Sequence, residues 1–113
     1  MKVRRREDVP KVLPPNHYDL ESQRIVDDTL GIKGLRISFV RMQQSGRADP
    51  HIHEDSEQLF IVLKGEMMMK TEQEEVRLLE GHTAFVPPGE VHGNWNGRDG
   101  ETQYLVITRD SNK

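Results

Sequence analysis

The sequence predicts an all-β domain built as a sandwich or barrel, and three observations carry this prediction. Nine glycines and six prolines interrupt the 113 residues, and no stretch between them has a convincing helical pattern. Short runs rich in β-branched and aromatic residues lie between these breaks, which is typical of all-β folds. The length fits one domain with a single core.

The expected elements follow one another with turn signals between them. Within residues 35–42 apolar and polar side chains alternate, with Leu35, Ile37 and Phe39 on one face, as in a strand. A glycine-containing loop is expected after residue 42. Segment 72–79 is Glu-rich and has helix propensity, but it has too few apolar residues for a helical stripe, so we expect a turn and then a strand. The expected strands are 22–27, 35–42, 59–63, 67–70, 75–79, 83–86, 91–96 and 102–108.

The composition argues against several classes of function. Sixteen basic and nineteen acidic residues give a net charge of −3, which offers no extended positive field for nucleic acid. The absence of cysteine excludes disulfides, iron–sulfur clusters, cysteine zinc sites and thiol nucleophiles. No signal peptide is recognisable, and the longest apolar run, 59–63, is far too short to span a membrane. We therefore expect a cytoplasmic protein with neither a nucleic-acid nor a membrane partner.

Two of the expected strands are apolar on both faces. Residues 59–63 and 104–107 are continuously apolar, whereas a strand with one solvated face alternates. One face of these strands would lie in the core, and the other needs cover from the N-terminal residues or from a second subunit. We therefore expect a homodimer.

The five histidines include one pair with a spacing that suits a metal. His51 and His53 are two residues apart, so on an extended segment their side chains point to the same face. Two imidazoles placed in this way can bind one ion. Such a pair is weak evidence by itself, because it also arises by chance.

Longer motifs around these histidines resemble those of the cupin family. Every fixed position of the family's second motif is matched, by Gly81, Pro87, Gly89, His92 and Asn96. The first motif is followed, with one residue too few in its first gap, by Gly46, His51, His53 and Gly65. The resemblance covers residues 35–108 and implies a cupin double-stranded β-helix, which is a jelly-roll barrel. Residues 1–34 are then expected to form an N-terminal arm with short extended segments, packed on the barrel or on a second subunit, and residues 35–113 to form the barrel.

The resemblance also implies a metal centre with three histidine ligands and one oxygen ligand. The histidines are His51, His53 and His92. Counting back from Gly65 selects Gln58 as the oxygen ligand, and we favour it because a slip of one residue turns a strand side chain to the other face. Glu57 is the alternative oxygen ligand, because the family's first motif has an acidic residue at this position. Nitrogen and oxygen donors suit Mn, Fe, Co, Ni, Cu or Zn, and Mn or Fe is favoured.

Other residues are candidates for the pocket around the metal. We expect Phe39, Arg41 and Asn94 to line it, with Arg41 able to meet an anionic substrate. Asn94 shares a strand face with the histidine ligand two residues before it. His17 is expected to have a structural role in the arm, and His82 to lie in a surface turn. No catalytic residue is assigned.

The resemblance implies a metal-dependent enzyme that acts on a small organic molecule. Such a cupin either activates dioxygen, as cupin dioxygenases do, or polarises a carbonyl or hydroxyl, as sugar and keto-acid isomerases and related lyases do. The alternative is a non-catalytic module that binds a small molecule or a metal, or that acts as a sensor. A metal-free cupin of the epimerase type is a third option, and the complete set of three histidines argues against it. The fold does not decide among these functions.

Overall fold

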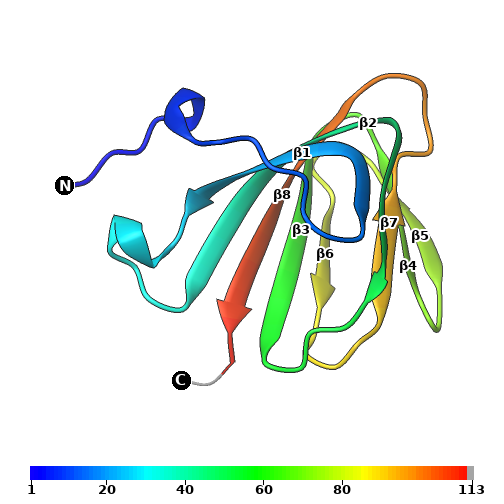
Figure 1. The fold of residues 1–113 in the computed structure, drawn as a ribbon. Coiled ribbons are helices and arrows are strands. Elements are labelled where there is room, and N and C mark those ends of the chain that lie inside the picture. Colours follow the sequence, from blue (N-terminus) through cyan, green and yellow to red (C-terminus); the bar gives the residue numbers. More distant parts are fainter. Residues whose placement is uncertain (112–113) are drawn as a thin grey trace.

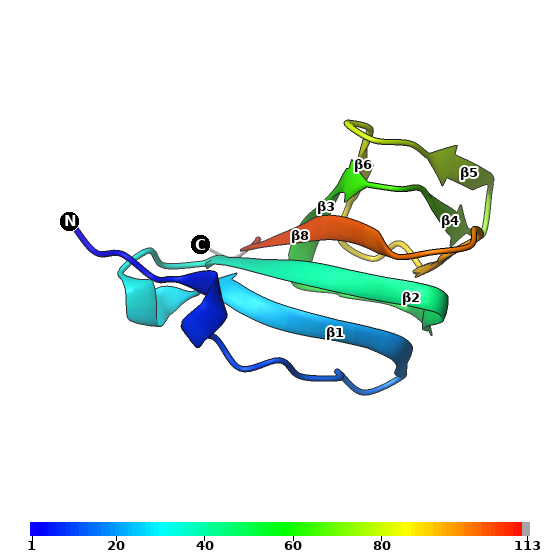
Figure 2. The same ribbon diagram turned by 90° about the horizontal axis from the view of Figure 1, so that it is seen from above.

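Strand β2 (Leu35–His51) is the long strand that joins the two layers of the molecule. Its first half pairs with β8 (Thr102–Asp110), and its second half pairs with β7 (His92–Trp95). Figures 1 and 2 show the nearly closed barrel that results in the computed structural model, which describes residues 1–111. The expected all-β barrel is confirmed.

The eight strands of residues 1–111 form one continuous hydrogen-bonded sheet that curls on itself. The strand order is β5-β4-β7-β2-β8-β3-β6. Strand β1 lies outside this order and pairs with β2. The remaining strands are β1 (His17–Val26), β3 (Ser56–Lys64), β4 (Met67–Thr71), β5 (Glu75–Leu78) and β6 (Thr83–Val86), and two short 3-10 helices are η1 (Arg6–Asp8) and η2 (Asp28–Leu30). In the described part of the chain, no helix has the length and apolar character needed to cross a membrane.

Strand β2 continues through residues 43–51, where the sequence predicts a loop. Gly46 does not end the strand. A Cβ atom at Gly46 would overlap Cγ of Met42 and would lie 2.9 Å from the carbonyl oxygen of Asp19. The glycine is therefore needed for a close approach between chain segments and not for a turn. The prediction of a loop was wrong for this reason.

Strand β1 begins at His17 and is longer than the predicted strand 22–27. It pairs with β2 along almost its whole length, so part of the expected arm belongs to the barrel sheet. Hydrogen bonds hold residues 6–9, which precede β1, against the outer face of this strand. Gln23 is 2% exposed and donates hydrogen bonds of 2.9 Å to the carbonyl oxygens of Arg6 and Val9. The Arg6 guanidinium then lies over the ring of Phe39, 4.5 Å from its centroid.

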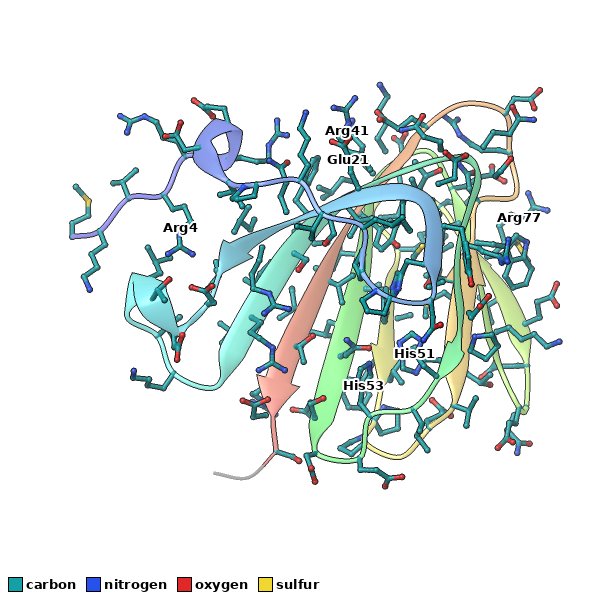
Figure 3. All side chains as sticks on the ribbon, viewed as in Figure 1. Arg4, Glu21, Arg41, His51, His53 and Arg77 are labelled. Carbon is teal, nitrogen blue, oxygen red and sulfur yellow. The ribbon has the colours of Figure 1, made fainter. Side chains whose placement is uncertain are left out.

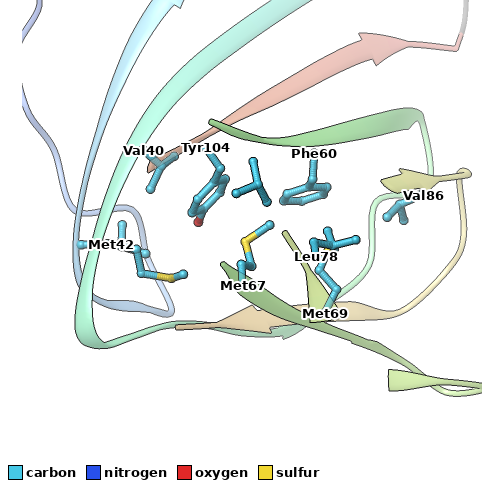
Figure 4. Packing of buried hydrophobic residues seen from close by; sticks show 10 residues of the cluster. Val40, Met42, Phe60, Met67, Met69, Leu78, Val86 and Tyr104 are labelled. Atoms are coloured by element: carbon cyan, nitrogen blue, oxygen red, sulfur yellow. The ribbon is translucent and has the colours of Figure 1, made fainter. Parts of the chain in front are cut away.

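The hydrophobic core lies between the two layers of the barrel (Figure 4). Its buried members come from β1 to β6 and from β8, and they are Leu20, Val40, Met42, Phe60, Val62, Met67, Met69, Leu78, Val86 and Tyr104. Along β4 the methionines alternate, since Met67 and Met69 are buried in this core and Met68 is on the other face. The buried Tyr104 hydroxyl accepts a hydrogen bond from Asn94 Nδ2 at 3.1 Å, and burial raises the pKa of Tyr104 to about 12.

A rigid corner leads from β6 into β7. Pro87 and Pro88 fix the backbone, and Gly89 has a φ of 84°, a left-handed conformation that favours glycine. The Gly89 N–H donates to the carbonyl oxygen of His53 at 2.8 Å. This hydrogen bond joins the segment before β7 to the segment after β2, so the two stretches that carry the cupin-like motifs meet at one end of the barrel.

Candidate metal centre

Three histidines from two parts of the chain meet at this end of the barrel. His51 ends β2, His53 follows it, and His92 begins β7, where His51 and His92 are register partners. Their ring centroids are 4.4 Å apart for His51 and His92, 4.9 Å for His51 and His53, and 5.6 Å for His53 and His92. One nitrogen of each ring lies within 4.8 Å of the other two, which is a grouping able to hold a metal ion. Figure 3 shows His51 and His53 side by side inside the barrel.

Backbone carbonyls orient two of the three rings. Nδ1 of His51 lies 2.8 Å from the carbonyl oxygen of Asp49, and Nδ1 of His92 lies 3.0 Å from that of Glu90. A carbonyl oxygen can only accept a hydrogen bond, so each Nδ1 carries the proton. In a neutral imidazole the lone pair is then on Nε2, which is the arrangement that metal-binding histidines use.

The surroundings keep two of the site histidines neutral. Burial lowers the pKa of His92 to about 4, and His51 and His53 add to this effect. The pKa of His53 is lowered by burial first, and then by the nearby His51 and Arg36. At neutral pH both rings are therefore uncharged, with lone pairs available to an ion.

Of the two candidates for the oxygen ligand, only Gln58 faces the histidines. Gln58 is 9% exposed, its Oε1 lies 2.9 Å from Nε2 of His92, and its Nε2 donates to Oγ1 of Thr108 at 3.0 Å. Glu57 lies on the opposite face of β3, where its carboxylate pairs with Arg109. The two residues are neighbours on a strand, so their side chains point to opposite sides of the sheet.

The contact between Gln58 and His92 fits a bound cation. Because Nδ1 of His92 holds the proton, the atoms that face each other at 2.9 Å, His92 Nε2 and Gln58 Oε1, both carry lone pairs. Two ligands at right angles with bonds of about 2.1 Å are about 3 Å apart, so both atoms can bind the same ion. The donor set of three imidazoles and one amide oxygen thus suits a divalent transition metal.

The comparisons with known proteins agree with this architecture. The family model of the cupin domain (Cupin_2) matches residues 38–108. This chain belongs to the cupin family. The polyketide cyclase RemF from Streptomyces resistomycificus is 25% identical to this cupin, with a TM-score of 0.82 over 97% of this chain and 84% of that one. A predicted oxalate decarboxylase from Thermotoga maritima has the same fold, with 17% identity and a TM-score of 0.85 over 96% of this chain and 98% of that one.

A curated relative matches a shorter stretch of the chain. YdbB from Bacillus subtilis, described as uncharacterized, is 39% identical over 49 residues, which is 42% of this cupin and 43% of that protein. The match thus spans less than half the length of this relative.

Next to the histidines the cupin has a cavity of about 350 Å³. His92, which is 1% exposed, does not line the cavity itself, but its ring centroid lies 4.4 Å from that of His51, which does. Asn94 lines the cavity and is also almost fully buried, with its amide held by Tyr104 and Met67. The lining comes from the arm, from β1, β2, β3, β7 and β8, and from the segment after β2. Its residues are Pro14, Pro15, Asn16, His17, Leu20, Ser22, Arg24, Ser38, Val40, His51, His53, Gln58, Phe60, Asn94, Tyr104, Val106 and Thr108.

Two of the three expected pocket residues lie outside the cavity. In the first half of β2 the residues that face the cavity are Ser38 and Val40, so Phe39 and Arg41 point outward. Phe39 packs beneath Arg6, and Nε of Arg41 donates to Oε2 of Glu101 at 2.7 Å. The prediction for these two residues was wrong, because a period of two shows which side chains share a face but not which face is inside.

The outward position of Arg41 makes it part of a surface network. Side-chain hydrogen bonds from Gln103, Arg41 and Gln43 lower the pKa of Glu101 to about 2, although burial acts in the opposite direction. The ionised Glu101 in turn raises the pKa of Arg41. The pair stabilises the outer surface and does not reach the histidines.

Two basic side chains of the cavity, those of His17 and Arg24, were not expected to line it. His17 lies in the lining, with its ring centroid 6.0 Å from that of His51 and its Nδ1 2.7 Å from the carbonyl oxygen of Pro15. Arg24 reaches the cavity from the same strand. Leu20, Ser22 and Arg24 share a face through the alternation along β1. His17 is an odd number of residues from Arg24 and reaches the same face only because the register shifts between Tyr18 and Leu20, which the sequence does not show. His82 lies in a surface turn, where its Nδ1 accepts a hydrogen bond from the Leu79 N–H at 3.0 Å.

Proposed function

We propose that this cupin is a metal-dependent enzyme that acts on a small organic molecule in the histidine cavity. The observation that carries the proposal is the contact of 2.9 Å between Nε2 of His92 and Oε1 of Gln58, next to two further imidazoles. We propose His51, His53, His92 and Gln58 as the ligands of one divalent transition metal, and we favour Mn²⁺ or Fe²⁺.

The choice of Gln58 over a carboxylate has a chemical consequence. An amide oxygen is neutral, so the site has the full +2 charge of the ion, whereas a carboxylate would reduce it by one. A bound ion of this kind polarises a carbonyl or hydroxyl oxygen of a ligand. The hydrogen bond from Gln58 Nε2 to Thr108 keeps the amide oxygen directed at His92, so the side chain is held ready for an ion.

The reaction class we favour is polarisation of a substrate oxygen, as in an isomerase, a lyase or a cyclase. Similarity to a polyketide cyclase that is 25% identical supports this choice. A cavity of about 350 Å³ lies at the lower end of the size range of small-molecule pockets, which restricts the substrate to a small metabolite. We propose that His17 and Asn94, which line the cavity, contact such a ligand.

Elemental analysis of purified protein tests the metal site. We expect about one transition-metal ion per chain, a marked loss of metal in His51→Ala and in Gln58→Ala, and no loss in Glu57→Ala. Glu57→Ala is the matched control, because it removes the neighbouring polar side chain on the opposite face of β3. Full metal content in Gln58→Ala would contradict its role as a ligand, and metal-free wild-type protein would contradict the proposed site.

Turnover tests the enzymatic part of the proposal. The metal-loaded protein would be incubated in deuterated water with hydroxy acids, keto acids and sugar phosphates, with and without oxygen, and followed by proton NMR. Turnover that needs no oxygen and stops when a chelator is added supports the favoured class. Turnover only with oxygen would favour a dioxygenase, and binding without turnover in any sample would favour the non-catalytic module.

We further propose that the protein is a homodimer, and the outer face of the barrel supports this. Apolar residues are paired in register across β6, β3 and β8, with Phe85 opposite Leu59, Leu59 opposite Ile107, and Ile61 opposite Leu105. Phe85 is 55% exposed, whereas Arg6 of the arm covers the neighbouring Phe39 on β2. A second copy suits this strip, because a two-fold axis would bring the same apolar surface against itself.

Sedimentation equilibrium at micromolar concentration tests the dimer. We expect wild-type protein to be dimeric and Phe85→Glu to be monomeric with unchanged circular dichroism. Val76→Ser is the control, since Val76 is an exposed apolar residue on β5, outside the strip. A monomeric wild-type protein would contradict the proposal.

A further inference from the structure

The lining of the histidine cavity has an unusual balance of charge. Among its described residues there is no aspartate, glutamate or lysine, and Arg24 is the one side chain with a permanent charge. The cavity therefore has a net positive charge even before any metal binds.

Arg24 belongs to the same row of side chains as the floor of the cavity. Arg24 on β1 is the register partner of Ser38 on β2. Ser38 is in turn paired with Val106 on β8, and Val106 is paired with Phe60 on β3. The ring of Phe60 in turn lies 5.9 Å from that of His92. Three strand spacings, roughly 14 Å along the curved sheet, thus separate Arg24 from the strand next to the histidines.

Arg24 has no acidic partner among residues 1–111, in contrast to neighbouring arginines. Arg36 pairs with Asp110 at 3.0 Å, Arg41 with Glu101 at 2.7 Å, and Arg47 with Asp49 at 3.2 Å. No carboxylate in the described structure lies within 4.0 Å of the Arg24 guanidinium. It is exposed and lies where the cavity meets a second groove under the arm, whose lining holds Lys2, Arg4 and Arg5 together with Asp8 and Asp27.

We propose that the cavity binds small organic acids and that Arg24 holds the carboxylate at the end far from the histidines. This inference rests on the proposed function, since the other end of the ligand faces the proposed metal site. The apolar side chains between the two ends, Val40, Val106 and Phe60, contact the hydrocarbon part of the ligand. The guanidinium has the planar donor geometry that matches a carboxylate, and the hydroxyl of Ser38 lies beside it in the row.

A matched series of ligands separates the two ends of the site. The probes are the dicarboxylates succinate, glutarate, adipate and pimelate, each compared with the monocarboxylate of the same chain length. One carboxylate of every probe can reach the metal end, but only a dicarboxylate has a second one for Arg24. Affinities are measured by isothermal titration calorimetry for wild type, Arg24→Gln and Arg77→Gln, after the metal content of each sample has been determined. Arg77 is the control because it lies on β5, where it pairs with Glu66.

We expect one dicarboxylate to bind wild-type protein at least tenfold more tightly than its monocarboxylate, since a charge-assisted hydrogen bond contributes about 1.5 kcal/mol or more. Arg24→Gln should lose this preference while retaining its metal and its affinity for the monocarboxylate, and Arg77→Gln should retain the preference. Equal affinities of Arg24→Gln and wild type for that dicarboxylate, or no preference at any length in wild type, would overturn the proposal.

The same samples separate this proposal from the proposed metal function. If the purified protein holds no metal, the proposed metal-dependent function is contradicted. The calorimetric titrations then measure the affinities of the metal-free protein. There a dicarboxylate that binds wild type at least tenfold more tightly than Arg24→Gln still supports the anion site, and equal binding overturns it. If metal is bound and the preference does not depend on Arg24, only the anion site fails.

Discussion

Asn96 connects three segments of the barrel, and replacing its amide by a carboxylate should weaken the fold strongly. The side chain is 6% exposed. Its Nδ2 donates to three carbonyl oxygens, at 3.1 Å to Met42, 2.9 Å to Gln43 and 2.9 Å to Gly100. Its Oδ1 accepts from the N–H of Arg98 at 3.1 Å. Asn96→Asp keeps the shape and the acceptor but removes both N–H donors.

The size of the effect follows from these contacts. Two N–H groups that three carbonyl oxygens share are lost, which costs about 1 kcal/mol for each N–H, and buried carbonyls left without a partner cost about 1–3 kcal/mol more. A carboxylate facing carbonyl oxygens adds repulsion, so we expect Asn96→Asp to lower the free energy of unfolding by about 3–5 kcal/mol. Asn96→Ala avoids the repulsion and should lower it by about 2–4 kcal/mol.

Urea unfolding followed by tryptophan fluorescence measures this difference. The sequence has one tryptophan, Trp95, which directly precedes Asn96 and reports on the same segment. Gln73→Glu is the control, because it makes the same change from amide to carboxylate at an exposed residue. An unfolding free energy of Asn96→Asp within about 0.5 kcal/mol of the wild-type value would refute the reasoning.

Three further predictions concern packing, a buried hydroxyl and pH. Gly46→Ala should destabilise the fold by about 1–3 kcal/mol because the new methyl group overlaps Met42, and an unchanged thermal midpoint would contradict this. Tyr104→Phe removes the hydroxyl that accepts from Asn94 and should cost about 1 kcal/mol in the same thermal assay, whereas an increase in stability would count against the hydrogen bond. Because the pKa of Glu101 is about 2 in the fold against an ordinary 4.5, its ionised form stabilises the protein fully above pH 4.5, and this is lost as the pH falls toward 2. The difference in thermal midpoint between wild type and Glu101→Gln should therefore shrink over that range, and a difference independent of pH would exclude this effect.

Much of the candidate site can be located from sequence, because its residues are fixed by spacing. His51 and His53 share a face through a period of two, and the turn at Pro87–Gly89 determines where His92 enters. The choice of Gln58 over Glu57 follows from register as well, since counting from Gly65 identifies the residue on the inner face. The structure places Gln58, and not Glu57, against His92.

The rest of the cavity could not be located in this way. The sequence shows Leu35, Ile37 and Phe39 as the regular apolar face of β2, yet the structure turns Phe39 outward under the arm and places Ser38 and Val40 inside. Alternation failed as a guide because the outer face of this barrel is itself apolar.

The sequence by itself determined the all-β class, the cupin motifs and which residues of each strand share a face. These are local properties, set by the period of an extended chain and by glycine and proline at turns. Only the tertiary structure decided which face lies inside, that β2 continues past Gly46, and that Arg24 of β1 reaches the histidine cavity. The reason is physical, because the direction of a face and the pairing of distant strands depend on contacts between residues far apart in the chain.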